Sequence, residues 1–269
     1  MTDEIALKAA ELLESLREKK PLVHHITNWV TISECASITR SLGALPVMAH
    51  ASEEVEEMVA ISGALVLNIG TLTPELIDTM IKAGKQANKK DVPVILDIVG
   101  VGATKLRTES ARKILDAVNV SVIKGNSGEI ATLAGAMAEV RGVESISIQG
   151  DAKAHARMLA KAEKCVVVIT APVDIITDGS RTFLVSNGHP RMGEVVGTGC
   201  MAASVIGAFA AVEKDITIAA ACAMSVYGIA GEMAAVDARG PGSMKQNMFD
   251  TIMAVGRKEI IKGARIDAA

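Results

Sequence analysis

Short runs of β-branched and aliphatic residues alternate with longer, partly polar stretches between residues 22 and 170. Such runs predict buried strands, and the stretches between them have the periodicity of helices. The six predicted strands are LVHHI (22–26), LPVMA (45–49), ALVLNI (64–69), PVILDI (93–98), NVSVI (119–123) and CVVVIT (165–170). Strands that alternate with helices are typical of a mainly parallel sheet covered by helices on both faces, so an α/β fold is expected.

Residues that cap helices stand before several of the intervening stretches. Thr73 precedes Pro74, Ser52 precedes two glutamates, and Thr108 precedes a glutamate and a periodic run. Ser and Thr side chains accept hydrogen bonds from free N–H groups of a first helical turn, and proline fits its first position. Helices are therefore expected to begin directly after these three caps. The charged stretch 1–20 predicts a further amphipathic helix.

The alternation of strands and helices stops after residue 170. The segment VDIITDGSRTFLVS (173–186) predicts two strands joined at Asp178-Gly179, which makes a β-hairpin on the edge of the main sheet. The remainder, 199–263, is predicted to be helical. No linker or internal repeat interrupts the chain, so residues 1–269 are expected to form a single domain.

An uncharged run at residues 195–212 is about as long as the shortest membrane spans. It opens with Gly-Thr-Gly and consists mostly of small residues, so its transfer into lipid would gain little free energy. A helix buried in a soluble core is the favoured interpretation.

Composition narrows the classes of ligand. Aromatic residues make up 2% of the chain and the net charge is −3, with basic residues scattered along the sequence. This gives neither stacking platforms for bases nor a basic patch, so no nucleic-acid or membrane partner is expected. The four cysteines show no CxxC spacing, which favours a reducing cytoplasm.

Polar residues or glycines stand at the carboxyl ends of the predicted strands. In open α/β sheets ligands bind at these ends, so a crevice is expected there. The residues concerned are Thr27, Asn28, Met48, Gly70, Thr71, Asp97, the segment 124–129 and Thr170.

The motif VVGTGC (195–200) stands directly before the small-residue run. Gly197 and Gly199 ahead of a helix would let backbone N–H groups converge on a phosphate or an oxyanion. The same glycines would also suit a tight turn that only packs helices closely. The spacing alone leaves both interpretations open.

Two acidic residues lie at or just after the ends of successive predicted strands. Asp97 ends an apolar strand, where an unpaired carboxylate would be costly, and Glu129 lies in KGNSGE (124–129) at a helix start. Together with Lys124 they suggest metal-assisted phosphoryl transfer, with the acids on Mg²⁺ and the lysine on phosphate. The alternative for the second motif is structural: Asn126 or Ser127 caps the helix and Glu129 favours its positive end.

The histidines and three of the cysteines show no pattern that predicts a catalytic or metal-binding role. His24 and His25 fall within a strand and are expected to be structural, and the remaining histidines form no zinc spacing. Cys35, Cys165 and Cys222 sit in apolar surroundings and are expected to be buried as small hydrophobic residues.

Eight segments together resemble hydroxyethylthiazole kinases, which belong to the ribokinase-like superfamily. They are PLVHHITNWV (21–30), ALPVMAHASEE (44–54), VLNIGTLTPE (66–75), KGNSGEI (124–130), VVVIT (166–170), DIITDG (174–179), VVGTGC (195–200) and GPGS (240–243). The resemblance covers nearly the whole chain. It implies a ribokinase-like domain that uses ATP and Mg²⁺ to phosphorylate the primary alcohol of 4-methyl-5-(2-hydroxyethyl)thiazole, a salvage step toward thiamine. It also implies a homotrimer with its sites between subunits.

The resemblance also implies roles for individual residues. The thiazole pocket would be lined by Asn28, Val30, Thr31, Met48 and Gly70, with Gly197 near the substrate hydroxyl. ATP would be bound by Lys124, Asn126, Thr170, Thr198 and Gly199. Asp97 and Glu129 would serve the metal and the phosphates. Many relatives have arginine in place of Lys124, so a point charge replaces a bidentate fork.

Cys200 stands where the wider superfamily commonly has an aspartate that receives the alcohol proton. Phosphoryl transfer passes through a loose transition state in most analyses, so positioning matters more than base strength and a thiol would suffice. The alternative is a small residue that merely fits the junction of loop and helix.

Two other functions are compatible with the sequence. One is a superfamily kinase that acts on another small alcohol, such as the hydroxymethylpyrimidine of the same pathway. The other is a nucleotide-binding regulatory protein that has lost turnover.

Overall fold

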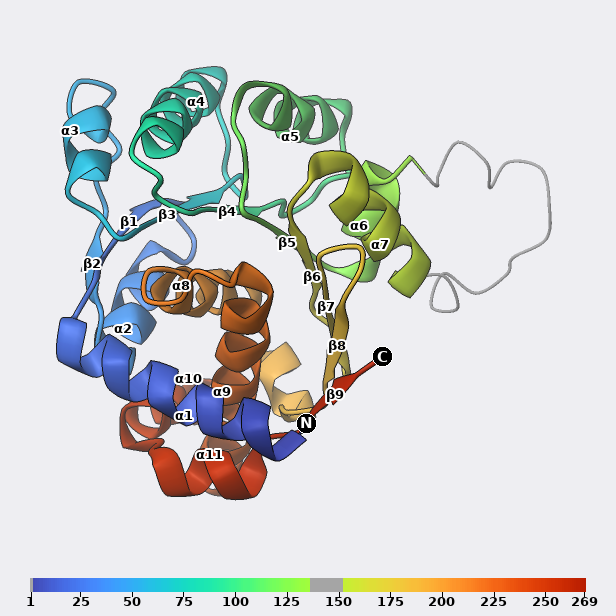
Figure 1. Ribbon diagram of the computed structural model, residues 1–269. Helices are drawn as coiled ribbons and strands as arrows, with labels where there is room; N and C mark the ends of the chain where they lie inside the picture. Colours follow the sequence, from blue (N-terminus) through green and yellow to red (C-terminus); the bar gives the residue numbers. More distant parts are fainter. Residues whose placement is uncertain (1, 136–151) are drawn as a thin grey trace.

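The computed structural model describes residues 2–135 and 152–269. Within them nine strands form one sheet in the order β2-β1-β3-β4-β5-β6-β7-β8-β9 (Figure 1). The strands are β1 (Leu22–Ile26), β2 (Leu45–Val47), β3 (Ala64–Asn68), β4 (Val94–Asp97), β5 (Val122–Gly125), β6 (Val166–Ile169), β7 (Asp174–Thr177), β8 (Thr182–Val185) and β9 (Ile266–Ala268). Strands β1 to β6 are parallel, and β7, β8 and β9 add antiparallel to one edge.

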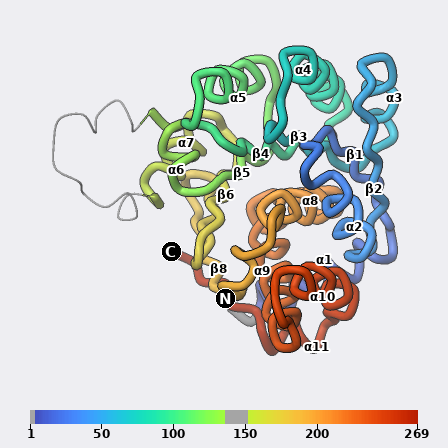
Figure 2. Tube along the Cα trace, turned by 180° about the vertical axis from the view of Figure 1, so that it is seen from behind, coloured from blue at the N-terminus to red at the C-terminus, as the bar shows by residue number. Residues whose placement is uncertain are grey.

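Helices cover both faces of the sheet, as Figures 1 and 2 show from opposite sides. One layer contains α3 (Val55–Ala60), α4 (Pro74–Lys89), α5 (Lys105–Ala117), α6 (Ser127–Leu133) and α7 (Ala152–Glu163). The other contains α1 (Thr2–Lys19), α2 (Ile32–Leu42), α8 (Thr198–Ala210), α9 (Ile216–Val236), α10 (Pro241–Ala254) and α11 (Arg257–Gly263). A short 3₁₀ helix, Pro190–Glu194, leads into α8.

The two layers bury alternate residues of the central strands. In β3, Leu65 and Leu67 pack in one hydrophobic cluster, while Ala64 and Val66 pack in the other. Successive side chains of a strand point to opposite faces, so a strand between two helical layers must be apolar throughout. This explains why the strands appear in the sequence as unbroken apolar runs.

The predicted α/β architecture and edge hairpin are confirmed. The strand predicted at 119–123 instead spans Val122–Gly125, so Lys124 lies within β5 and not beyond it. Strand β9 was not predicted, because three residues near a terminus give too short a pattern. It pairs with β8 and becomes the edge of the sheet.

One of the three predicted helix starts is confirmed and two are wrong. The Thr73 hydroxyl accepts a hydrogen bond from Leu76 N at the start of α4. Helix α5 begins earlier than predicted, because the cap is Thr104, whereas the Thr108 hydroxyl bonds the Thr104 carbonyl inside the helix. Helix α3 begins later than Ser52, at Val55, which is the first residue of that segment to be buried.

Helices α8 and α9 form the apolar centre of their layer. Every residue from Met201 to Ala210 is buried, as expected for the uncharged run. Among the described residues, one helix, α9, is long and apolar enough to cross a membrane, but 78% of its most apolar window is buried inside the fold.

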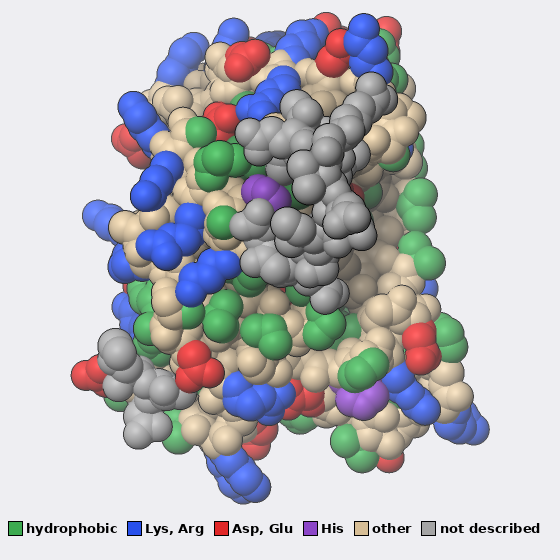
Figure 3. Space-filling model, turned by 90° about the vertical axis from the view of Figure 1, so that its right-hand side faces the viewer, with side chains coloured by type: hydrophobic (Ala, Val, Ile, Leu, Met, Phe, Trp, Pro, Cys, Tyr) green, Lys and Arg blue, Asp and Glu red, His purple; other side chains and the backbone are tan. Residues whose placement is uncertain are grey.

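The face seen in Figure 3, on the right-hand side of Figure 1, carries both basic and acidic side chains, and several basic ones lie close together on its left half.

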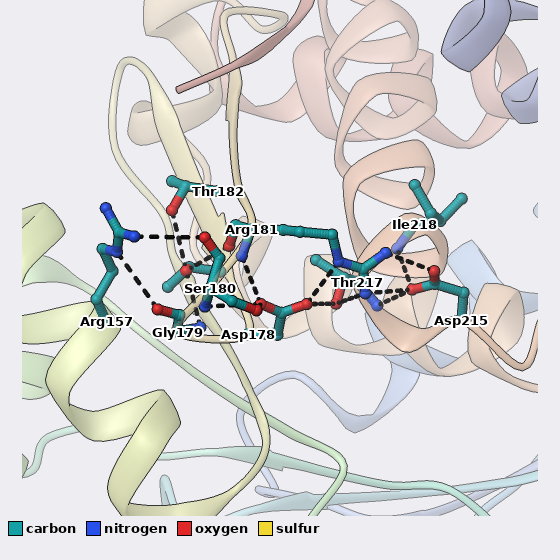
Figure 4. Close-up of polar contacts among 10 residues, drawn as sticks. Arg157, Asp178, Gly179, Ser180, Arg181, Thr182, Asp215, Thr217 and Ile218 are labelled. Atoms are coloured by element: carbon teal, nitrogen blue, oxygen red, sulfur yellow. Dashed lines mark hydrogen bonds and ion pairs between the residues drawn. The ribbon is translucent and has the colours of Figure 1, made fainter.

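An ionic network ties the β7–β8 hairpin to the start of α9 (Figure 4). The Arg181 guanidinium donates to Asp178 Oδ2 at 2.7 Å and to Asp215 Oδ2 at 2.6 Å. Thr217 Oγ1 donates to Asp178 Oδ2 at 3.1 Å, and Asp215 also caps α9. Burial alone would raise the pKa of Asp178, but N–H donors from Ser180 and Arg181 hold it well below its usual range.

Arg181→Ala is expected to destabilise the protein by about 1 kcal/mol, because exposed ion pairs are screened and only their combination in a network contributes measurably. The Arg181 side chain is 49% exposed, so the loss should shrink in 1 M salt. The measurement is urea unfolding at low and high salt. Lys113→Ala, which breaks an exposed pair with Asp78, is the control and should change stability less. Equal stability of Arg181→Ala and wild type at low salt would contradict a role for the network.

Candidate active site

The carboxyl ends of the central parallel strands bring four polar side chains together. Asn68 ends β3 and Asp97 ends β4, and the register pairs Asp97 with Asn68 on one side and with Lys124 of β5 on the other. Asn28 follows β1. All four are buried, with Lys124 the most exposed at 4%. Buried polar groups need hydrogen-bond partners, and these residues supply partners for one another.

The four side chains form one continuous polar chain that ends at Cys200. Lys124 Nζ donates to Asp97 Oδ1 at 3.1 Å, and Asn68 Nδ2 donates to Asp97 Oδ2 at 2.7 Å. Asn28 Nδ2 donates to Asn68 Oδ1 at 3.0 Å and to Cys200 Sγ at 3.4 Å. The structure thus connects the predicted residues Lys124, Asp97, Asn28 and Cys200 by hydrogen bonds, with Asn68 as the link between Asp97 and Asn28.

Asp97 and Lys124 form a buried ion pair. Burial raises the pKa of Asp97 to about 6, although the Lys124 ammonium opposes this shift. Burial alone would lower the pKa of Lys124, but the Asp97 carboxylate outweighs it and the net pKa is raised. Each group therefore favours the charged form of the other.

The Gly-Thr-Gly turn brings the first turn of α8 close to this pair. Gly197 has φ 95°, and a Cβ there would lie 2.6 Å from Thr31 Cγ2, so both the turn and the close packing require glycine. A Cβ at Gly199 would lie 3.1 Å from Lys124 Nζ. Gly197 provides no side-chain cap, so the first N–H groups of α8 have no side-chain acceptor from their own N-cap. The geometry therefore fits a tight turn and an anion site at the same time.

Cys200 differs from the other cysteines in exposure. It is partly exposed, whereas Cys35, Cys165 and Cys222 are buried, as predicted. Burial raises the pKa values of those three thiols to about 11, 12 and 12, in that order. Cys200 is thus the cysteine that a ligand in the site can reach.

The predicted second acid, Glu129, makes a capping box at the start of α6. Asn126 Oδ1 accepts from Glu129 N at 2.9 Å, and Glu129 Oε2 accepts from Asn126 N at 2.8 Å. Glu129 Oε1 also accepts from Gly100 N at 2.7 Å, which joins the loop after β4 to α6. The structural alternative for this motif is therefore realised, and it leaves the remaining oxygen lone pairs of Glu129 for a ligand.

Three of the predicted substrate residues, Val30, Thr31 and Gly70, gather around Asn28. Asn28 Oδ1 accepts from Val30 N at 3.1 Å and from Thr31 N at 3.0 Å. Gly70 lies against Asn28, because a Cβ at Gly70 would be 3.0 Å from Asn28 Cβ. Met48 lies beyond β2, where its carbonyl bonds His50 Nδ1.

A cavity of about 480 Å³ lies beside the Gly-Thr-Gly turn. Three of the five predicted ATP residues, Thr170, Thr198 and Gly199, are among those lining it, whereas Lys124 and Asn126 are not. Asp174 also lines it, and burial raises the pKa of this carboxyl to about 7. The volume is within the range of small-ligand pockets.

Two residues of the site were missed in the sequence. Asn68 stands in an apolar strand, which is the same signal that drew attention to Asp97. Arg107 bridges two strand-end loops, since its guanidinium donates to the carbonyls of Gly70 at 2.8 Å and Val99 at 2.9 Å. No local pattern marks Arg107, because its partners are backbone carbonyls, and that of Gly70 is 37 residues away in the sequence.

The two strand histidines are structural, as predicted. His25 is fully buried, bonds Ser204 Oγ at 3.1 Å, and has its pKa lowered to about 3 by burial. His24 Nε2 lies 2.7 Å from the Ala49 carbonyl. In residues 2–135 and 152–269, no three His, Cys, Asp or Glu side chains gather as ready-made metal ligands.

The chain is similar to known proteins over most of its length. The model of the hydroxyethylthiazole kinase family matches residues 13–258. The hydroxyethylthiazole kinase of Methanosarcina acetivorans is 56% identical over 250 residues, covering 93% of this chain and 96% of its own. That of Thermoanaerobacter pseudethanolicus is 56% identical over 259 residues, covering 96% and 98%.

Solved structures extend the similarity to the fold. The hydroxyethylthiazole kinase protein of Pyrococcus horikoshii superposes with a TM-score of 0.89 at 40% identity, covering 97% of this chain and 98% of its own. A ribokinase-like superfamily protein of Enterococcus faecalis has a TM-score of 0.63 at 16% identity, covering 92% and 95%, which shows the shared fold alone. With a family match over most of its length and relatives above half identity, the chain belongs to the hydroxyethylthiazole kinase family.

Proposed function

We propose that the protein phosphorylates the primary alcohol of 4-methyl-5-(2-hydroxyethyl)thiazole with ATP, a salvage step toward thiamine. The observation that supports this most is the series of hydrogen-bonded side chains from Lys124 to Cys200, which ends at the start of α8. The relatives of this protein are named for the same kinase activity. Phosphoryl transfer depends on positioning and charge stabilisation, and this chain provides both in a buried setting.

The alcohol is proposed to bind at the Asn28 end of the polar chain. Val30, Thr31, Met48 and Gly70 would surround the thiazole ring, and Gly197 would lie near the hydroxyl. Cys200 would then face the reacting oxygen. Its sulfur would either accept the alcohol proton or only fill the start of α8.

The phosphates are proposed to bind at the other end, between Lys124 and the first turn of α8. Thr170, Thr198 and Gly199 would hold the nucleotide in the adjacent cavity, and Asn126 would contribute from the start of α6. Within residues 2–135 and 152–269 the buried Lys124 ammonium donates to one side chain, that of Asp97, so donors remain for an anion.

The donor set near Lys124 fits Mg²⁺. Asp97 and Glu129 offer hard carboxylate oxygens, and Mg²⁺ bound with substrate phosphates needs only one or two protein carboxylates. The ion would supply neutralisation of phosphate charge. Asp97 would at the same time keep Lys124 in place.

Turnover of the thiazole alcohol is expected to require a divalent cation. ADP release would be followed with ATP, Mg²⁺ and a panel of vitamin-precursor alcohols that includes the hydroxymethylpyrimidine. Glu129→Gln should lower the rate because the charge is lost, and its melting temperature must be measured because glutamine keeps only one acceptor oxygen for two backbone donors. Turnover undiminished by EDTA would sink the metal proposal, and ATP binding without ADP release would favour the regulatory alternative.

We further propose a homotrimer with sites between subunits. Large apolar side chains are exposed next to predicted substrate residues: Trp29 is 59%, Val30 63% and Val196 73% exposed. Apolar patches beside a site are typical of surfaces covered by a partner.

Sedimentation is expected to give three times the 28.0 kDa monomer mass. Val196→Glu should weaken the assembly, because it places a charge on the exposed apolar surface, whereas Met158→Glu on α7 serves as the matched control. A fully active monomer at assay concentration would refute the shared site.

A cytoplasmic location and the lack of nucleic-acid or membrane partners stay predictions from the sequence. Fractionation of cells and titration with DNA, RNA and lipid vesicles would test them.

Cys200→Ala is expected to cost clearly less than the ~10²–10³-fold typical of losing an oxyanion donor, because the backbone N–H groups of α8 survive the change. Gly197→Ala should do more harm, since it strains φ 95° and clashes with Thr31. Cys200→Asp should retain or raise activity, because a carboxylate is a better proton acceptor and is tolerated at a helix N-terminus.

The three Cys200 and Gly197 variants are compared by kcat and KM after their folding has been checked by melting. Repulsion between a new carboxylate and the phosphates opposes the gain in Cys200→Asp. Inactivity of folded Cys200→Asp together with equal inactivity of Cys200→Ala would mean that the thiol has a role explained by neither backbone electrostatics nor a simple base.

A further inference from the structure

Asn68 is the residue through which the two halves of the site are joined. It is 1% exposed, and both ends of its amide are used. Its Oδ1 accepts from Gly70 N at 2.9 Å and from Asn28 Nδ2 at 3.0 Å, while its Nδ2 donates to Asp97 Oδ2 at 2.7 Å.

Backbone donors fix the orientation of both amides in the chain. Asn28 Oδ1 faces the N–H groups of Val30 and Thr31, so that atom must be the oxygen and Nδ2 must face Asn68 and Cys200. Asn68 Oδ1 faces Gly70 N, so its Nδ2 must face Asp97. The direction of each bond therefore does not depend on a choice between amide flips.

The consequence for Asp97 is a carboxylate that is held at both oxygens. Asn68 bonds Oδ2 and Lys124 bonds Oδ1, so the plane of the carboxylate is set from two sides. Without Asn68 one oxygen would be free, the carboxylate could turn, and Lys124 would lose a fixed partner.

We propose that Asn68 is a positioning residue for phosphoryl transfer: it orients Asp97, and through it Lys124, relative to Asn28 and Cys200. This inference rests on the proposed kinase function. Asn68 would touch neither substrate in this role. Residues that orient the charged groups of a site typically change activity about 10- to 100-fold when replaced.

Two variants separate positioning from packing. Asn68→Ala removes all three hydrogen bonds. Asn68→Asp keeps the shape and both acceptor bonds but turns an oxygen toward the Asp97 carboxylate where an N–H stood. Repulsion there should lower kcat by a larger factor than Asn68→Ala, with KM for the alcohol changing less than kcat.

Asn88→Ala is the matched control. Asn88 also uses both ends of its amide, with Asn119 N and O at 2.8 Å each, but it lies near the amino ends of the strands. This control should lower the melting temperature without changing kcat per folded molecule. The kcat of each Asn68 variant is likewise measured per folded molecule, at a temperature where melting shows that it is folded. A kcat of both Asn68 variants within about twofold of wild type would overturn the proposal, since even the low end of the expected loss is about tenfold.

A second readout needs no substrate. Hydrogen exchange of the Asn28 side-chain amide, followed by NMR in the ligand-free protein, should quicken in Asn68→Ala because an acceptor is lost. It should stay slow in Asn68→Asp and in the control, where the Asn28 bond survives. If the wild-type protein phosphorylates no thiazole alcohol, the proposed function falls. The positioning by Asn68 is then judged on this exchange alone, and unchanged exchange in Asn68→Ala overturns it.

Discussion

The buried pair of Lys124 and Asp97 is the constraint on which the rest of the site depends. Taking two charges out of water costs several kcal/mol for each, in order-of-magnitude terms, and their attraction offsets this only with good geometry and further hydrogen bonds. An apolar pair at the same place would stabilise a sheet at least as well. The charges are therefore best explained by the chemistry at the strand ends, and every neighbour has to accommodate them.

The neighbours do so through register and through small residues. Parallel pairing sets Asn68, Asp97 and Lys124 side by side on three adjacent strands, which no single segment of sequence could achieve. Helix α8 can come close to these strands because its residues are small: a Cβ at Gly207 would lie 2.6 Å from Val66 Cγ2. The small apolar run thus serves packing first, and the close approach then places Cys200 over the strand ends.

Burial could be predicted from the sequence, whereas strand register and long-range contacts could not. Hydrophobic runs record burial, so the central strands, the buried α8 and the polar strand end at Asp97 were all visible. Register and long-range partners leave no local pattern. The link from Asn68 to Asp97 and the bond from Arg107 to the distant Gly70 carbonyl therefore had to come from the structure. Helix caps could be predicted only in part. Thr104 and Thr108 both suit an N-cap, and only the backbone conformation decides between them.

A thiol at position 200 is consistent with this electrostatic arrangement. In the proposed site, Asp97 and Lys124 offset each other's charge, so the attraction for a phosphate would come from the first turn of α8 and from the remaining N–H donors of Lys124. Asn28 adds an N–H that points at the sulfur. A carboxylate at position 200 would compete with the proposed phosphates for these donors, whereas a cysteine has no carboxylate oxygens to do so. In the proposed site, a side chain at position 200 that accepts a proton better also competes more strongly with the phosphates. The buried residues from Lys124 to Asn28 hold the donors for which the two would compete.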